Sequence, residues 1–346
     1  MKELAKFNEL KGKGQRDRGI NDCDRALKTF KWGKIPRYMQ ANSPNTNISF
    51  PPSLQPGDLL KVVSPSGGLK ELDRLQSGMK IWRDRGYRLE YSQHWDTRYS
   101  YLAGTDAQRR QSLAEAWFDP ECKGILCARG GYGSMRLLEH WHWKQARGKR
   151  QEATKWLIGF SDITGLLWSL IRAKMGGGVH APVLTTLATE PEWSIQRLFD
   201  LVEGRPLAAI AGQGWGGGKT TGILLPANLT VATHLLGTDL QPPLENIILA
   251  LEDVTEAPYR LDRQLTQWRL LGAFKGVVGI ALGRFSQCEG NPGDWTVEEM
   301  LRDRLSDLQI PIVSDLPFGH DGVNAALPVG IMAELDGDRG VLAINP

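Results

Sequence analysis

The sequence lacks the features that mark a membrane, secreted or zinc-binding protein. No apolar run approaches the ~18 residues that a membrane span requires, and the N-terminus has no apolar core of a secretory signal. The four cysteines, Cys23, Cys122, Cys127 and Cys288, are scattered, and no two have the spacing of a zinc or redox motif. We therefore expect a cytoplasmic protein with reduced cysteines, with no membrane as partner.

Histidine is scarce, and the charge is nearly balanced. The His-Glu-x-x-His motif is absent, and the six histidines form no clear ligand set with acidic residues. His140 and His142 are two residues apart, so they would point to different faces of a helix. The net charge is +3, and no long stretch of Lys and Arg interleaved with aromatics occurs in the expected folded part. We expect no metal site and no nucleic-acid partner.

The length and composition predict two folded domains with an appended arm. At 346 residues the chain exceeds the roughly 250 residues at which a single core usually stops growing. Residues 1–50 are basic and have little apolar periodicity, which predicts a solvated or partner-covered extension. An organelle transit segment is the alternative interpretation, but acidic residues such as Glu3 are unusual in such segments. We predict an N-terminal domain over 51–189, a linker over 190–220 and a C-terminal domain over 221–346.

Strand and helix patterns alternate along most of the chain. In the first domain we expect strands at 59–63, 88–91, 124–128 and 156–160 and helices at 69–85, 106–117, 134–145 and 163–174. Strands separated by helices predict an α/β domain with a doubly wound, mostly parallel sheet. Beyond the predicted linker we expect strands at 247–251, 277–282 and 312–313, helices at 259–271 and 297–308, and a hairpin at 330–335 and 340–344. This pattern predicts a second, mixed α/β domain.

Two glycine-rich segments are similar to nucleotide-binding loops but depart from them. Residues 216–220 read GGGKT, yet Gln213 stands where a phosphate-binding loop has its first glycine, and no strand precedes the segment. Gly131 and Gly133 follow a strand, but Arg136 occupies the third glycine position of a dinucleotide fingerprint and would obstruct helix–strand packing. Neither segment predicts a cofactor, and we expect none.

Ser134 lies where an expected strand passes through a glycine-rich turn into an expected helix. Such an elbow exposes a hydroxyl at the carboxyl edge of a sheet, where free backbone N–H groups and the helix dipole stabilise an oxyanion. The order GYGSMR departs from the Gly-x-Ser-x-Gly elbow, and a helix-capping serine is the alternative interpretation. We predict that Ser134 is a nucleophile, with the Met135 N–H as an oxyanion donor and Gly131 as part of the supporting turn.

Ser161 is a second serine between an expected strand and an expected helix, within the segment GFSDIT at 159–164. It too could cap a helix. The adjacent Asp162 cannot easily orient a histidine toward that same serine. For this reason we predict supporting roles for Ser161 and Asp162 and prefer Ser134 as the nucleophile.

The segments around both serines, ARGGYGS at 128–134 and GFSDIT at 159–164, resemble those of the LD-carboxypeptidases, also called muramoyltetrapeptide carboxypeptidases. Four further segments are similar to that family: LAGTD at 102–106, NLT at 228–230, LEDVTEAPYRLDR at 251–263 and PFGH at 317–320. The resemblance extends from about Gly57 to the C-terminus. Residues 180–182 read His-Ala-Pro where the family usually has His-Gly-Pro, which could alter the pocket wall.

The resemblance implies a Ser-Glu-His triad that is shared between the two domains. Matched residue by residue, the triad is Ser134, Glu252 and His320. Glu252 and His320 both follow expected strands, and α/β proteins assemble their sites at strand ends. Asp253 and Glu256 are rival candidates for the acid.

The resemblance also implies the reaction and the partners. His320 would take the proton of the serine as its hydroxyl attacks an amide carbonyl, and would then pass it to the leaving D-alanine, while Glu252 stabilises the imidazolium. The implied substrate is a murein-derived tetrapeptide that loses its terminal D-Ala in peptidoglycan recycling. Members of the family are commonly dimers, so we expect a homodimer.

Two other functions stay open at this point. The microcin C self-immunity peptidases share the fold and triad of the same family but cleave a peptidyl-nucleotide amide. The chain could also be a small-molecule binding protein that kept the fold and lost catalysis. The presence of all three triad residues argues against this function. The tryptophans Trp141, Trp143, Trp193 and Trp215 could reshape the pocket entrance or could pack in the core.

Overall fold

The computed structural model describes residues 48, 50–143 and 154–344. The predicted extension over 1–50 lies almost entirely outside the described residues, as does the last part of the helix expected at 134–145.

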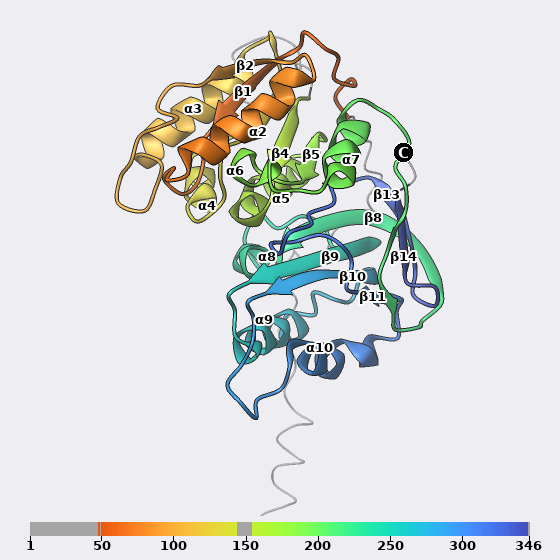
Figure 1. Ribbon diagram of the computed structural model, residues 1–346. Helices are drawn as coiled ribbons and strands as arrows, with labels where there is room; N and C mark the ends of the chain where they lie inside the picture. Colours follow the sequence, from red (N-terminus) through yellow and green to blue (C-terminus); the bar gives the residue numbers. More distant parts are fainter. Residues whose placement is uncertain (1–47, 49, 144–153, 345–346) are drawn as a thin grey trace, which may run out of the picture. The chain divides into compact units, whose positions relative to one another are not determined.

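The first sheet has six strands in the order β12-β5-β4-β3-β1-β2; β1, β2, β4 and β5 are labelled in Figure 1. Its strands are β1 (Leu59–Val63), β2 (Arg88–Tyr91), β3 (Cys122–Cys127), β4 (Trp156–Gly159), β5 (Gly178–His180) and β12 (Leu327–Pro328). β1 to β5 are parallel, and β12 is antiparallel to β5. The strand order reverses at β1, whose neighbours are β2 and β3. In such a sheet the carboxyl ends of the strands at the reversal are the expected place for a ligand.

Helices cover both faces of this sheet. They are α2 (Leu72–Asp84), α3 (Asp106–Phe118), α4 (Ser134–Leu138), η2 (Ser161–Ile163), α5 (Thr164–Arg172), α6 (Leu184–Leu187) and α7 (Glu192–Val202). Ile125 of β3 packs in a cluster with side chains of α3, α4 and α5. Its neighbour Leu126 points to the other face and packs with α2, α6 and α7. The doubly wound, mostly parallel arrangement predicted from the sequence is confirmed.

The second sheet has eight strands in the order β6-β14-β13-β8-β9-β10-β11-β7. They are β6 (Ile210–Ala211), β7 (Gln213–Gly214), β8 (Lys219–Asn228), β9 (Ile247–Val254), β10 (Val277–Ser286), β11 (Ile312–Ser314), β13 (Met332–Asp336) and β14 (Val341–Ile344). The helices are α8 (Leu229–Leu235), α9 (Pro258–Leu270), α10 (Val297–Leu305) and η3 (Ser306–Leu308). β8 to β11 are parallel and the other strands antiparallel, so the predicted mixed α/β fold of this part is also confirmed.

The two sheets are joined where the helix after β4 meets the end of β8. The Asn228 N–H at the end of β8 donates to the Thr164 hydroxyl at the start of α5, over 2.9 Å. Further along α5, the Trp168 indole N–H donates to the Pro226 carbonyl over 3.0 Å. Because Asn228 is the register partner of Glu252 on β9, these contacts bring the carboxyl ends of β4 and β9 together.

Two local features differ from the sequence prediction. The predicted linker contains α7, whose Leu198, Phe199 and Val202 are buried against the first sheet, as well as β6 and β7 of the second sheet. The helix that begins at Ser134 ends at Leu138, because the chain then turns Trp141 and Trp143 into the core. Core packing is therefore the role of these two tryptophans.

Two absences and the state of three cysteines concern the described part of the chain alone. No helix in it is long and apolar enough to cross a membrane. No three His, Cys, Asp or Glu side chains within it are placed to hold a metal ion. Cys122, Cys127 and Cys288 are buried free thiols.

Candidate active site

Glu252 and His320 form a hydrogen-bonded pair at the carboxyl end of the second sheet. His320 Nδ1 lies 2.6 Å from Glu252 Oε2. Glu252 is fully buried on β9, whereas the His320 side chain is partly exposed. With the Nδ1–H donating to the carboxylate, Nε2 remains to exchange a proton with a reacting group.

The electrostatics of the pair favour a positively charged imidazole. Burial lowers the pKa of His320, but the negative charge of Glu252 and the hydrogen bond to it outweigh this, so the net pKa is raised above its usual value. The pair thus stabilises the imidazolium that a general base becomes.

The turn that presents His320 is fixed by close packing. The Arg284 N–H on β10 donates to the Phe318 carbonyl over 2.8 Å. A Cβ on Gly283 would lie 2.4 Å from that carbonyl oxygen, so this approach requires glycine. Gly319 has φ of +127°, a conformation that glycine adopts without strain. These constraints set the direction of His320 toward Glu252.

The two rival acids have other partners. Asp253 accepts hydrogen bonds from the Asn228 amide over 2.9 Å and from the Thr230 N–H and hydroxyl over 2.8 and 2.7 Å. Burial raises the pKa of Asp253, and the neighbouring Glu252 adds to this. Glu256 lies 3.6 Å from Arg260 in an ion pair. Of the three carboxylates, Glu252 is the one that bonds to His320.

Ser134 is enclosed between helices. Its side chain is 0% exposed, and its hydroxyl donates to the Asp162 carbonyl. Its N–H donates to Asp162 Oδ2 over 2.8 Å. A Cβ on Gly165 of α5 would lie 3.0 Å from Ser134 Oγ, which shows how closely α5 covers the hydroxyl. The Ser134 hydroxyl is therefore buried and already bonded to a backbone carbonyl.

Ser161 has the backbone of a strained elbow between β4 and α5. Its φ is +62°, which is uncommon for a residue with a Cβ. Strain of this kind often occurs at functional sites, and a sharp strand-to-helix turn is typical of nucleophilic serines. The residue is partly exposed, and its hydroxyl has no hydrogen-bond partner among the residues that the structure describes. The ring of the preceding Phe160 lies 4.7 Å from the His320 ring, between centroids.

Asp162 connects the loops that follow three neighbouring strands. Its Oδ2 accepts hydrogen bonds from the Ser66 hydroxyl over 2.5 Å and from the Ser134 N–H over 2.8 Å. Ser66 follows β1, Ser134 follows β3, and Asp162 follows β4. The buried carboxylate therefore holds together the edge of the sheet on which Ser161 lies.

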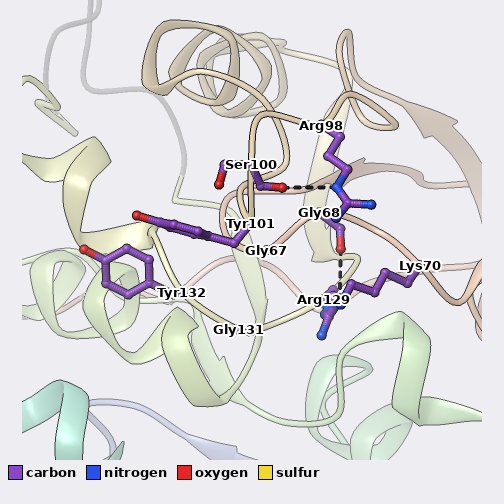
Figure 2. A pocket seen from close by; sticks show the side chains of 9 residues that line it. All are labelled: Gly67, Gly68, Lys70, Arg98, Ser100, Tyr101, Arg129, Gly131 and Tyr132. Carbon is purple, nitrogen blue, oxygen red and sulfur yellow. Dashed lines mark hydrogen bonds between the residues drawn. The ribbon is translucent and has the colours of Figure 1, made fainter.

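A pocket of about 690 Å³ lies beside this edge, at the reversal of strand order between β1 and β3 (Figure 2). Its lining residues are Gly67, Gly68, Lys70, Arg98, Ser100, Tyr101, Arg129, Gly131 and Tyr132. Apart from Gly131, none of these residues was predicted as a site residue, because they come from loops without periodic pattern. The rule that ligands bind at a topological switch point is the signal that could have located them.

Gly130 separates this pocket from Ser161 and offers a test of the elbow. A Cβ at position 130 would lie 3.1 Å from Ser161 Cβ and 3.2 Å from its Oγ. Gly130 does not have a positive φ, so alanine is compatible with its backbone. We expect Gly130→Ala to displace the Ser161 hydroxyl. For the peptide hydrolysis that the sequence resemblance implies, kcat should fall about 10- to 100-fold with little change in KM, as measured by steady-state kinetics.

Thermal unfolding provides the control for this variant. A Tm close to that of the unmodified chain would attribute the loss of kcat to local displacement. Unchanged kcat with the fold intact would contradict a functional role for the Ser161 elbow.

Two family models match the chain. One, described as the LD-carboxypeptidase N-terminal domain, matches residues 60–181, and the other, described as the LD-carboxypeptidase C-terminal domain, matches residues 221–335. A putative carboxypeptidase from Synechocystis sp. is 58% identical over 86% of this chain and 97% of its own length. A murein tetrapeptide carboxypeptidase from Pseudomonas aeruginosa is 34% identical over 80% of this chain and 93% of its own.

Solved structures share the fold. A muramoyltetrapeptide carboxypeptidase from Oxalobacter formigenes has a TM-score of 0.72 at 26% identity, covering 82% of this chain and 97% of its own. A microcin C7 self-immunity protein has a TM-score of 0.77 at 21% identity, covering 86% and 98%. At that level of identity the second likeness shows the fold alone.

Proposed function

This chain belongs to the LD-carboxypeptidase family of serine peptidases, and on that premise we propose that it releases terminal D-alanine from murein tetrapeptides. In this proposal Ser161 is the nucleophile, His320 the general base and Glu252 the carboxylate that orients the base. The supporting observation is the Glu252–His320 pair, bonded over 2.6 Å beside a strained serine elbow whose Phe160 contacts the His320 ring.

The choice of Ser161 replaces the sequence-based preference for Ser134. An attacking hydroxyl must reach both a base and a substrate carbonyl. The Ser134 hydroxyl is enclosed and donates to the Asp162 carbonyl, whereas the Ser161 hydroxyl is partly exposed and follows the residue that touches His320. We assign to Ser134 and Asp162 the role of fixing the loops around Ser161.

The mechanism that we propose has two steps. The Ser161 Oγ attacks the carbonyl of the scissile amide as His320 Nε2 takes its proton, and the imidazolium then donates that proton to the nitrogen of the departing D-alanine. Water, activated by the same imidazole, hydrolyses the resulting ester. Glu252 stabilises the positive charge on His320 during both steps.

The oxyanion donors follow from the choice of nucleophile. The backbone N–H directly after a nucleophilic serine commonly stabilises the oxyanion, so we assign this role to the Asp162 N–H. Gly131, which lines the adjacent pocket, keeps the supporting role that the sequence predicted for it. Met135 would serve in this way only if Ser134 were the nucleophile.

The substrate is tested by the release of D-alanine from the tetrapeptide L-Ala-γ-D-Glu-meso-diaminopimelate-D-Ala. We expect D-alanine and a tripeptide by mass spectrometry, and no release from a matched tetrapeptide that ends in L-alanine. A peptidyl-nucleotide amide, the alternative substrate raised by the sequence resemblance, is assayed in parallel. Cleavage of that amide without D-alanine release would overturn the proposal, as would the absence of any hydrolysis.

The cytoplasmic location and the homodimer stay predictions.

A further inference from the structure

We propose that the pocket at the β1/β3 strand reversal binds a carboxylate of the peptide substrate through Lys70, Arg98 and Arg129. This inference rests on the proposed function and adds to it a residue set that selects the substrate.

The position of the pocket connects it with the reacting serine. Its lining includes Gly67 and Gly131, and the Gly67 N–H donates to the Gly130 carbonyl over 3.1 Å. A Cβ on Gly130 would lie 3.2 Å from Ser161 Oγ. One residue, Gly130, thus separates the pocket lining from the proposed nucleophile. A peptide held in the pocket needs to extend only past Gly130 to place an amide at Ser161.

The charge of the pocket is positive. The Arg129 guanidinium donates to the Gly68 carbonyl over 2.9 Å and lies 3.7 Å from Glu71. Arg98 donates to the Ser100 carbonyl over 3.1 Å, which leaves its charge unneutralised. Neither Arg98 nor Lys70 has an acidic partner among the described residues. Within the part of the chain that the structure describes, the three cations have one ion-pair partner, Glu71. This excess of positive charge favours an anionic ligand, and guanidinium groups bind carboxylates well.

The opposite wall is aromatic. Tyr101 and Tyr132 are 63% and 55% exposed, and their ring centroids lie 5.7 Å apart. Figure 2 shows the three cationic side chains on one side of the pocket and the two tyrosines on the other. Exposed aromatic rings can pack against the aliphatic parts of a ligand. Charge on one side and rings on the other fit a peptide that carries both carboxylates and aliphatic segments.

The test measures binding, so that it does not depend on turnover. The full-length Ser161→Ala variant, checked for the absence of D-alanine release, is titrated calorimetrically with the tetrapeptide. Three analogues each remove one carboxylate: D-alaninamide at the C-terminus, D-isoglutamine in place of D-Glu, and lysine in place of diaminopimelate. Each titration is repeated with Arg98→Ala or Lys70→Ala added. Arg74→Ala is the matched control, because Arg74 is exposed on α2 and does not line the pocket.

We expect Arg98→Ala and Lys70→Ala each to weaken tetrapeptide binding about 10-fold, the size of one charge-assisted contact. Arg74→Ala should have no effect. One analogue should bind to the Ser161→Ala protein about 10-fold more weakly than the tetrapeptide does. Its affinity should fall little further when Arg98 or Lys70 is also replaced, because both changes remove the same contact. That analogue identifies the carboxylate.

The proposal is overturned if Arg98→Ala and Lys70→Ala leave the affinity for all four peptides equal to that of the Ser161→Ala protein. It is also overturned if they lower the affinity for all four peptides equally while the Tm is unchanged. It is also overturned if AMP, as a nucleotide probe, binds through Arg98 and Lys70 more tightly than the tetrapeptide. Failure of the proposed function has a different signature, since it appears as the absence of D-alanine release by the unmodified chain.

Discussion

Replacing Ser161 with alanine is expected to lower kcat by about 10⁴- to 10⁶-fold, as removal of a serine nucleophile does in other hydrolases. The matched variant is Ser134→Ala, which removes a buried hydroxyl from the same edge of the sheet. Its hydroxyl bonds to the Asp162 carbonyl, so its loss should cost about 1 kcal/mol of stability and less than about 10-fold in kcat. The kcat of each variant is measured by D-alanine release at saturating tetrapeptide.

The paired design makes the result independent of folding. Circular dichroism and Tm establish that each variant folds. If Ser134→Ala abolished turnover while Ser161→Ala retained it, the sequence-based preference for Ser134 would be restored and our assignment would fail.

Glu252→Gln has the second large effect that we expect. The amide keeps the shape of the side chain but removes the charge that stabilises the imidazolium, and comparable changes lower kcat about 10⁴-fold. The pH profile should change as well. His320 must be neutral to act as a base, so activity rises as the pH rises through its pKa, which Glu252 raises above the usual 6.5. Without that charge the pKa falls, and the acid limb of kcat/KM should move to lower pH.

Asp253→Asn is the comparison for this profile, because Asp253 adjoins Glu252 on β9 and binds Asn228 and Thr230 instead of His320. It should move the acid limb less, since its influence on the His320 pKa ranks below that of Glu252. An acid limb that stayed in place in Glu252→Gln, or moved to higher pH, would contradict the proposed role of Glu252.

Much of the fold could be predicted from the sequence because buried parallel strands have a strong apolar pattern. The buried strand β1 has the bounds that were expected. The partly exposed edge strand β2 does as well, and the helices α3 and α9 differ by one residue at one or both ends. α7 was missed, although its buried Leu198, Phe199 and Val202 follow helical spacing, because the glycines that follow it dominated the interpretation of the segment. The pairing of β12 with β5 could not be predicted, since it joins strands far apart in the sequence.

The site was only partly predictable for reasons that are also physical. Glu252 and His320 could be located by resemblance, and the structure brings them together. The choice between two serines depends on burial and on the φ of Ser161, and neither can be obtained from residue types. The objection that Asp162 adjoins Ser161 does not apply, because the acid that bonds to His320 comes from the second sheet.

The most direct test of the Ser161–His320–Glu252 assignment is to label the protein with a fluorophosphonate and locate the adduct by tandem mass spectrometry. Trypsin separates the two candidates, because cleavage after Arg129 and Arg136 places Ser134 in peptide 130–136, whereas Ser161 lies in peptide 156–172. We predict the adduct on Ser161 in the unmodified chain and its loss in His320→Ala. An adduct on Ser134, or labelling of Ser161 that does not depend on His320, would contradict the assignment.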